Sequence, residues 1–300
     1  MKGFILVILL FTTNSWASYL FVEGSFNPTQ RWSEFSKDPE INIKNLFQQL
    51  IKSKTGKALL KAAKDKSSEY GSTLYDIVKE GEGSLTDTTL VRRFNMASPE
   101  HIVYESKSKI YLNKNLTQYD ALLDLAHELT HFVYRKNFNP YVKNFSLSEF
   151  IRNTIEGTGG EVQAFVVECI VHSELFPGKM DSKYNCENIY DKESKKFSTK
   201  LAIKKFYQVG SYYESFIGVL NKHGIVSEFP EISESKESFI SSAYGIPYPV
   251  AAFEEYLTVL NKVCENDKRR LGYMKVGEGR SPASVNQFES DYKTRCKDIF

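Results

Sequence analysis

The segment that decides the fold is Leu125-Ala126-His127-Glu128-Leu129-Thr130-His131. His127 and His131 are one helical turn apart, so on an α-helix their imidazoles face the same side with Cβ atoms about 5–6 Å apart. Two imidazoles placed in this way can bind one metal ion, and the spacing is typical of a zinc site. Glu128 lies on the flank of the same face, where its carboxylate can reach an attacking water rather than the ion.

The residues around this segment predict a well-bounded amphipathic helix. Thr117 is a good N-cap and Asp120 is placed like a capping-box acid, so the helix is expected to begin at Gln118. Apolar side chains follow at helical spacing and form one stripe: Leu122, Leu125, Ala126, Leu129 and Val133. The chain from Asn137 to Pro140 is expected to end the helix. The alternative is a core or surface helix that carries two histidines by coincidence.

Length and composition are those of a globular protein. The chain has 300 residues, of which 41% are hydrophobic, which is enough for one large domain or two modest ones. Its formal net charge is +2. A charge this close to zero favours neither a nucleic acid nor an anionic membrane as a partner.

The first residues have the pattern of a secretory signal. Lys2 is followed by the apolar run from Phe4 to Phe11 and then by Ser15-Trp16-Ala17, with small residues where a signal peptidase cleaves. We therefore expect residues 1–17 to be removed after Ala17. The run is too short to span a bilayer, and no later segment approaches the roughly 18 apolar residues required. The sequence predicts an exported protein, periplasmic or secreted, without stable membrane insertion after cleavage.

The four cysteines are Cys169, Cys186, Cys264 and Cys296. An even number in an exported chain predicts two disulfides. Proximity in the sequence favours Cys169 with Cys186 and Cys264 with Cys296. Because Cys169 and Cys264 fall on apolar helix faces, buried free thiols are the alternative. No two cysteines have the Cys-x-x-Cys spacing of a cysteine zinc site or redox pair.

Short β-branched and aromatic runs before the histidine helix predict a small sheet. Two or three strands are expected in the runs Thr88 to Phe94, His101 to Tyr104 and Lys109 to Leu112. Glu105-Ser106-Lys107-Ser108 has the length and polarity of a hairpin connection between the last two.

Most of the remaining chain has helical periodicity. A helix from Ile41 to Lys64, broken or bent near Gly56, is expected before the sheet. After the histidine helix, further helices are expected from Lys200 to Asn221 and from Pro249 to about Asp267. The fold class is therefore α+β and predominantly helical.

A catalytic zinc site needs a third protein ligand and one open position. The residues directly after His131 include no histidine, so a carboxylate from a following helix is expected, either Glu156 or Glu161. We favour Glu161, because the small Ala164 and the preceding glycines allow close packing of its helix against the first. Glu161 also forms a capping-box pattern with Thr158, so a purely capping carboxylate is the alternative.

Three features together resemble the gluzincin group of zinc metallopeptidases. They are the strand Ile110 to Leu112, the segment from His127 to His131, and the later Glu161-x-x-Ala164. The resemblance covers roughly residues 100–175 and implies a zincin-like core in which a small sheet precedes the histidine helix.

The resemblance also implies roles for individual residues. His127, His131 and Glu161 would bind one zinc ion, and Glu128 would be the general base. One position departs from the pattern, because thermolysin-like members have an acid four residues after the third ligand, where this chain has Phe165. A partner that orients a histidine must then come from elsewhere in the chain.

On this interpretation the chain has three parts after the signal. Residues 18–100 would form a helical prelude and the first strand, residues 101–180 the zincin-like metal-binding core, and residues 181–300 a helical C-terminal lobe. All of 18–300 is expected to act as one catalytic unit.

The other histidines are expected outside the site. His172 shares the helix of Glu161 but lies about 16 Å along it, too far for the same ion. His101 is expected in a strand, and His223 at a helix end, where the dipole favours it. Tyr244 and Tyr248 could each donate a hydrogen bond to an oxyanion, and the sequence does not distinguish them.

These features predict an exported zinc metallopeptidase that hydrolyses protein or peptide substrates. Two alternatives stay open at this point. One is a non-catalytic exported protein in which a structural zinc joins two helices. The other is a zinc amide hydrolase that acts on cell-wall peptides.

Overall fold

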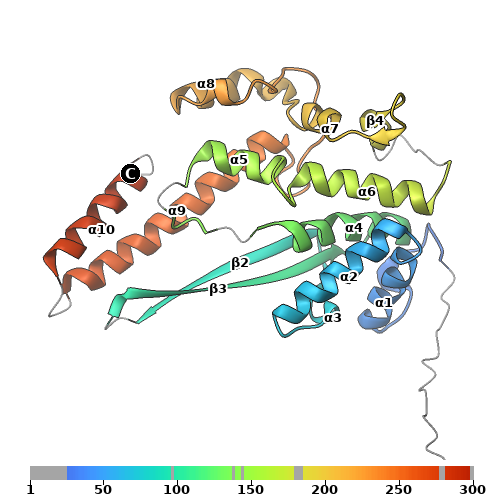
Figure 1. The fold of residues 1–300 in the computed structure, drawn as a ribbon, viewed down its shortest axis with the longest axis horizontal. Helices are drawn as coiled ribbons and strands as arrows, with labels where there is room; N and C mark the ends of the chain where they lie inside the picture. Colours follow the sequence, from blue (N-terminus) through green and yellow to red (C-terminus); the bar gives the residue numbers. More distant parts are fainter. Residues whose placement is uncertain are drawn as a thin grey trace, which may run out of the picture.

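Helices pack around one small mixed sheet, as Figure 1 shows. The computed structural model describes residues 26–95, 98–136, 139–142, 145–178, 185–276 and 281–297. The predicted signal segment 1–17 lies outside the described residues. The expected class, α+β and predominantly helical, is confirmed.

The main sheet has the strand order β1-β3-β2. Its strands are β1 (Val78–Gly81), β2 (Leu85–Asn95) and β3 (Ser98–Asn113). β1 pairs with β3 in parallel, and β2 pairs with β3 in antiparallel orientation. β2 therefore forms one outer edge of the sheet.

The predicted connection from Glu105 to Ser108 is wrong. These residues lie inside β3, where Glu105 pairs with Val91 and Lys107 pairs with Thr89. The chain instead reverses between β2 and β3. Most side chains of β3 from His101 to Lys109 are exposed or half-buried, so their polarity reflects a solvated strand and not a turn. The short parallel strand β1 was not predicted.

Three helices precede or adjoin the sheet: α1 (Pro39–Leu50), α2 (Lys54–Glu69) and α3 (Leu74–Ile77). The predicted break near Gly56 is displaced, because α1 ends at Leu50 and Ser53 caps α2 by accepting a hydrogen bond from the Gly56 N–H. A Cβ atom at Gly56 would lie 2.4 Å from the Leu50 carbonyl oxygen. Glycine at this position therefore allows α1 and α2 to approach closely.

The helix α4 (Gln118–Tyr134) follows the sheet, and the other helices come after it. They are α5 (Leu147–Ile155), α6 (Glu161–Leu175), α7 (Thr199–Phe206), α8 (Tyr213–Lys222), α9 (Tyr248–Val276) and α10 (Pro282–Arg295). Two short strands, β4 (Tyr190–Asp191) and β5 (Lys196–Phe197), form a second sheet. Single turns of 3-10 helix occur at Trp32–Glu34, Cys186–Ile189, Gly210–Tyr212 and Val226–Glu228.

The predicted continuous helix from Lys200 to Asn221 is wrong. The helix stops after Phe206, because the Val209 and Gly210 N–H groups donate to the carbonyls of Ser233 and Ser235. The last predicted helix is present as α9 and runs nine residues beyond Asp267, to Val276.

Two apolar cores meet at α6. One contains α1, α2, the sheet and α4, and Val171 of α6 belongs to it. The other contains helices α5 to α9, and Val162, Phe165 and Cys169 of α6 belong to that one. α6 thus lies directly against α4 while it is held by the C-terminal helices. The predicted division of the chain at residues 100 and 180 stays a prediction.

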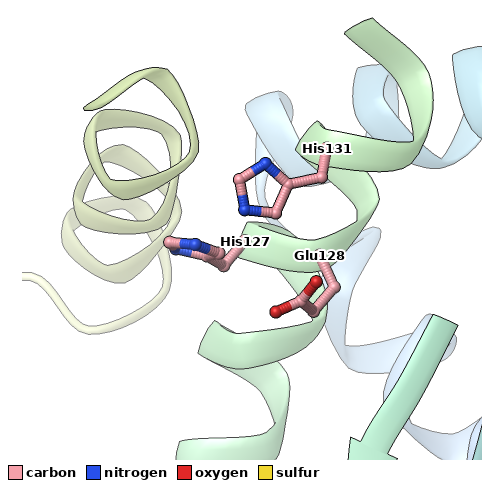
Figure 2. Close-up of side chains that lie close together, drawn as sticks. All are labelled: His127, Glu128 and His131. Atoms are coloured by element: carbon pink, nitrogen blue, oxygen red, sulfur yellow. The ribbon is translucent and has the colours of Figure 1, made fainter. Parts of the chain in front are cut away.

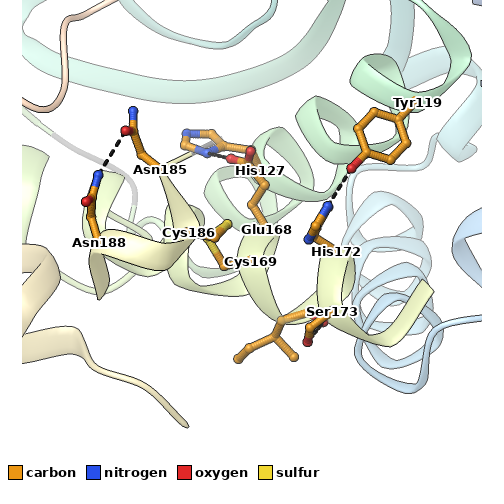
Figure 3. Close-up of a disulfide and its surroundings, with 10 residues drawn as sticks. Tyr119, His127, Glu168, Cys169, His172, Ser173, Asn185, Cys186 and Asn188 are labelled. Atoms are coloured by element: carbon orange, nitrogen blue, oxygen red, sulfur yellow. Dashed lines mark hydrogen bonds and ion pairs between the residues drawn. A yellow bond between two sulfur atoms is a disulfide. The ribbon is translucent and has the colours of Figure 1, made fainter. Parts of the chain in front are cut away.

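Both predicted disulfides are present. Cys169 of α6 is bonded to Cys186, and Cys264 of α9 is bonded to Cys296, directly after α10 (Figure 3 shows the first). Two disulfides fit a protein of an oxidising compartment such as the periplasm or the cell exterior. Within the described residues, no helix is both long and apolar enough to cross a bilayer.

Candidate metal centre

The helix α4 begins as the sequence predicts. The Thr117 side chain accepts a hydrogen bond from the Asp120 N–H (3.1 Å) and donates one to the Asp120 carboxylate (2.9 Å). Its predicted apolar stripe is buried, apart from the partly buried Val133 at the end. The helix ends at Tyr134, before the expected terminator, and Arg135 is its C-cap. This firm placement fixes the direction of the site side chains.

His127, Glu128 and His131 form a group that could hold one metal ion. One ligand atom from each lies within 4.8 Å of the others, and the two imidazole centroids are 4.8 Å apart. Figure 2 shows the three side chains on the same side of α4. Glu128 and His131 are buried, and His127 is half-buried.

The carboxylate of Glu161 lies against both imidazoles. Its Oε2 is 3.2 Å from His127 Nε2, and its Oε1 is 3.4 Å from His131 Nε2. Arg135 donates a hydrogen bond of 3.2 Å to the same Oε1. Glu161 is the first residue of α6, where the N-cap is Gly160 and no side chain caps the helix. The capping box with Thr158 is therefore not formed.

Glu156 is engaged elsewhere. It is the exposed C-cap of α5, and its carboxylate accepts a hydrogen bond of 3.1 Å from the Tyr207 hydroxyl. Of the two candidates from the sequence, the structure brings only Glu161 to the histidines.

Each imidazole uses its other nitrogen for a fixed partner. His127 Nδ1 is 3.0 Å from Glu168 Oε2, and His131 Nδ1 is 2.7 Å from the Gly159 carbonyl oxygen (Figure 3 shows the first pair). Such partners orient metal-binding histidines and set the nitrogen that faces the ion. In both residues, Nε2 is thereby directed to the space that the Glu161 carboxylate borders.

Sequence reasoning missed Glu168. It lies seven residues after Glu161, which is two helical turns along the same face of α6, and this spacing was the available signal. Phe165, the position where thermolysin-like members have their acid, is instead part of the apolar core. The histidine partner is present in this chain, one turn further along the helix.

The carboxylate of Glu128 is held by the edge strand. The Thr86 hydroxyl of β2 lies 2.7 Å from Glu128 Oε2 and 2.9 Å from the Glu128 carbonyl oxygen. This contact ties β2 to α4 beside the two histidines. It was not foreseen, because nothing in a single sequence pairs a strand threonine with a helix acid.

The charges of the site are strongly coupled. Burial favours neutral His127, but the Glu161 and Glu168 carboxylates hold the pKa of His127 well above its usual value. Burial likewise favours neutral Glu161, yet the two imidazoles hold the pKa of Glu161 well below its usual value. Burial and the neighbouring Glu168 raise the pKa of Asp124, one turn before Glu128 on α4, to about 7.

The structure separates the two candidate tyrosines. Burial and the carboxylates of Glu161, Glu128, Glu168 and Asp124 raise the pKa of Tyr248 well above its usual value. The negative charges of these four carboxylates therefore disfavour ionisation of its hydroxyl, which keeps its proton. Tyr244 is 42% exposed, and partial burial and the carboxylates of Glu255 and Glu254 raise the pKa of its hydroxyl.

The remaining histidines lie where the sequence placed them. His172 is buried, with Nε2 2.5 Å from the Tyr119 hydroxyl. His101 is an exposed residue of β3, and His223 is the C-cap of α8. In the part of the chain that the structure describes, none of the three belongs to the metal-binding group.

The donor set is suited to zinc. Two imidazole nitrogens and one carboxylate oxygen are a known set for catalytic zinc, which leaves one position open. The convergence of these donors, each imidazole with its own second partner, is what a preformed site requires. No protein family, curated protein or solved structure matches the chain. The likeness to gluzincins thus rests on these residues alone.

Proposed function

We propose that this chain is an exported zinc metallopeptidase of gluzincin type. His127, His131 and Glu161 would hold the ion, and the core around α4 and α6 would be zincin-like. The observation that carries the proposal is the Glu161 carboxylate, which lies 3.2 Å and 3.4 Å from the Nε2 atoms of the two histidines.

Zinc in such a site polarises a carbonyl group and lowers the pKa of water to around neutrality. Glu128 would accept the proton of the attacking water and donate it to the leaving amine. The hydroxyl of Thr86 supports this role, because it fixes the carboxylate orientation before substrate binds.

Two further features suit a peptide substrate. β2 is an edge strand next to Glu128, so an extended peptide could add to it by main-chain hydrogen bonds. The Tyr248 hydroxyl, kept protonated by the surrounding acids, could donate to the carbonyl oxygen that gains charge.

The test is hydrolysis by the zinc-loaded chain and by its Glu128→Gln variant. Both are incubated with a peptide library and with cell-wall peptides, and the zinc content of each is measured. Glu128→Gln should keep the zinc and the fold and lose about 100-fold or more in rate, because an amide cannot accept the proton. Glu187→Gln, at an exposed position of the Cys186–Ile189 turn, is the matched control and should retain the rate.

The outcomes separate the competing functions. Hydrolysis of cell-wall peptides alone would identify the amide hydrolase named above. Bound zinc without hydrolysis of any substrate would mean a structural metal, and full activity in Glu128→Gln would remove Glu128 as the base.

A further inference from the structure

A cavity of about 240 Å³ lies between the outer part of β2 and the C-terminal half of α9. β2 contributes Arg92 and Phe94 to its lining, and α9 contributes Asn266, Arg269 and Tyr273. Tyr141, in the segment after α4, also lines it. Among the described residues that line it, two are arginines and none is acidic.

The charge at this cavity is positive. Arg92 is 6% exposed and donates from Nη1 to the fully buried Asp267 at 2.8 Å. Arg295 binds the other oxygen of the same carboxylate, so two guanidinium groups share one acid. Arg92 Nε is buried and has no hydrogen-bond partner among the described residues. Two guanidinium groups and one carboxylate leave an excess positive charge beside the cavity, so an anion bound there would be favoured.

Aromatic rings hold the guanidinium in place. The Arg92 group stacks on the Tyr141 ring at 4.0 Å. Tyr141 in turn contacts Tyr104 of β3, and Phe94 contacts Tyr273 of α9, each at 6.0 Å between centroids. A planar guanidinium held in one orientation is well suited to bind a carboxylate by paired hydrogen bonds.

The cavity and the metal centre lie along the same face of β2. Thr86 and Arg92 are six residues apart in β2, and the register between them is regular. Their side chains therefore point to the same face, about 20 Å apart.

The two ends of this face contact different helices. Thr86 contacts Glu128 of α4 at one end, and Arg92 contacts Asp267 of α9 at the other. Figure 1 shows β2 running from α4 to beneath α9. Between them on this face, Thr88 is exposed and Leu90 is half-buried.

We propose that this cavity binds a carboxylate of the peptide substrate, about six residues from the bond cleaved at the metal centre. The inference rests on the proposed function, because a peptide added to the edge of β2 would connect the two places. The carboxylate is supplied either by an acidic side chain or by the C-terminus of the peptide. A carboxylate from either source would contact Arg269 at the exposed rim of the cavity before it reached Arg92.

Binding can be tested without turnover. The zinc-loaded Glu128→Gln chain is titrated into fluorescently labelled ten-residue peptides of one base sequence, and affinity is read by anisotropy. One pair of peptides differs only in a C-terminal carboxylate or amide. The other pair is amidated and differs only in glutamate or glutamine near the C-terminus. The member with the carboxylate should bind about tenfold more tightly in at least one pair, and that pair identifies the source.

Arg269→Gln should reduce this preference and leave the binding of the neutral peptides unchanged, because Arg92 remains in the cavity. Lys262→Gln is the control, because it removes one exposed cation from the same helix outside the cavity. Equal binding within both pairs, an unaltered preference in Arg269→Gln, or an equal loss in Lys262→Gln would overturn the inference. Failure of the proposed function would look different: the wild-type chain would cleave no peptide although the binding preference persisted.

Discussion

His127 Nδ1 lies 3.0 Å from Glu168 Oε2, across the interface between α4 and α6. The same helix α6 also supplies Glu161, which faces Nε2 of the same ring. One imidazole is thus held between two carboxylates two turns apart on a single helix. The position of α6 therefore controls both the third ligand and the orientation of the first.

The pair of His127 and Glu168 predicts a graded effect on metal affinity. Glu168→Ala should weaken zinc binding by about 10- to 100-fold, since loss of such a partner frees the ring and lowers its basicity. Glu168→Gln should lose less, because the amide oxygen still accepts from Nδ1. Chelator competition measures the affinities, with the exposed Glu187→Ala as a control for lost charge. An affinity unchanged in Glu168→Ala would show that the contact does not orient the ligand.

The sequence was sufficient for features that are local. Thr117, Asp120 and the apolar stripe determine where α4 begins and which face is buried, and from these the pairing of His127 with His131 follows. Cysteines near each other in the sequence were likewise paired correctly.

Features that depend on how distant elements cross could not be predicted in the same way. The contacts of Glu168 and Thr86 require the placement of α6 and β2 on α4, which no local pattern encodes. The continuity of β3 was missed for a related reason. Its outer half is exposed on one face and only half-buried on most of the other, so the usual alternation of apolar and polar residues is lost.

Gly159 should be intolerant of any side chain. Its φ is +71°, and a Cβ atom there would lie 2.2 Å from the Arg135 nitrogen at the end of α4. Gly159→Ala must displace the carbonyl that binds His131, so both stability and zinc affinity should fall. Gly71→Ala is the matched control, because its φ is +67° but the space around it is open. Gly71→Ala should lower the free energy of unfolding by about 1 kcal/mol, the cost of the left-handed backbone conformation for alanine, and should leave zinc affinity unchanged. Denaturant unfolding and zinc titration of both variants would reveal the difference, and equal losses would argue against the close approach.

The two disulfides should have different effects: one on the stability of α10, the other on zinc affinity. α10 has no fully buried residue, and the bond from Cys264 to Cys296 closes a loop with a sequence separation of 32 residues. Replacing Cys264 and Cys296 by serine should lower the free energy of unfolding by about 3–4 kcal/mol, because the unfolded chain is no longer constrained by this loop. Hydrogen exchange should then show that α10 is released, and zinc affinity should be retained. Replacing Cys169 and Cys186 should instead weaken zinc binding, because Cys169 adjoins Glu168 in α6. Equal effects of the two double variants on zinc would contradict this assignment.

Asp124 predicts a pH dependence of the metal-free protein. Burial and Glu168 raise its pKa to about 7, whereas an unfolded aspartate titrates near pH 4. Between these values the folded state holds a proton that the unfolded state has lost, so this residue's contribution to stability falls as pH rises. Asp124→Asn removes the effect. With chelator present, the stability of the wild type relative to the variant should decline by about 1–3 kcal/mol from pH 4 to pH 7. Parallel curves for the two proteins would contradict the raised pKa.

The third ligand is the most consequential prediction, because the proposed function depends on it. Glu161→Ala would leave two protein ligands and should weaken zinc affinity by orders of magnitude. Glu156→Ala should change it little, since that carboxylate is bonded to Tyr207. Zinc titration followed by thermal unfolding measures both effects, because bound metal stabilises the native state by an amount that grows with the logarithm of the zinc concentration divided by Kd. The zinc-dependent rise in unfolding temperature should disappear in Glu161→Ala and persist in Glu156→Ala.

The metal-free proteins provide the control for this comparison. Without zinc, Glu161→Ala also loses its contacts to His127 and Arg135, so its own unfolding temperature must be the reference for any shift. Only the increment on adding zinc then reports ligation. Two outcomes would contradict the assignment: loss of that increment in Glu156→Ala alone, or its persistence in Glu161→Ala. The Glu161 carboxylate would then be only a charge partner of the histidines in the metal-free state, and another residue would have to supply the third ligand of the ion.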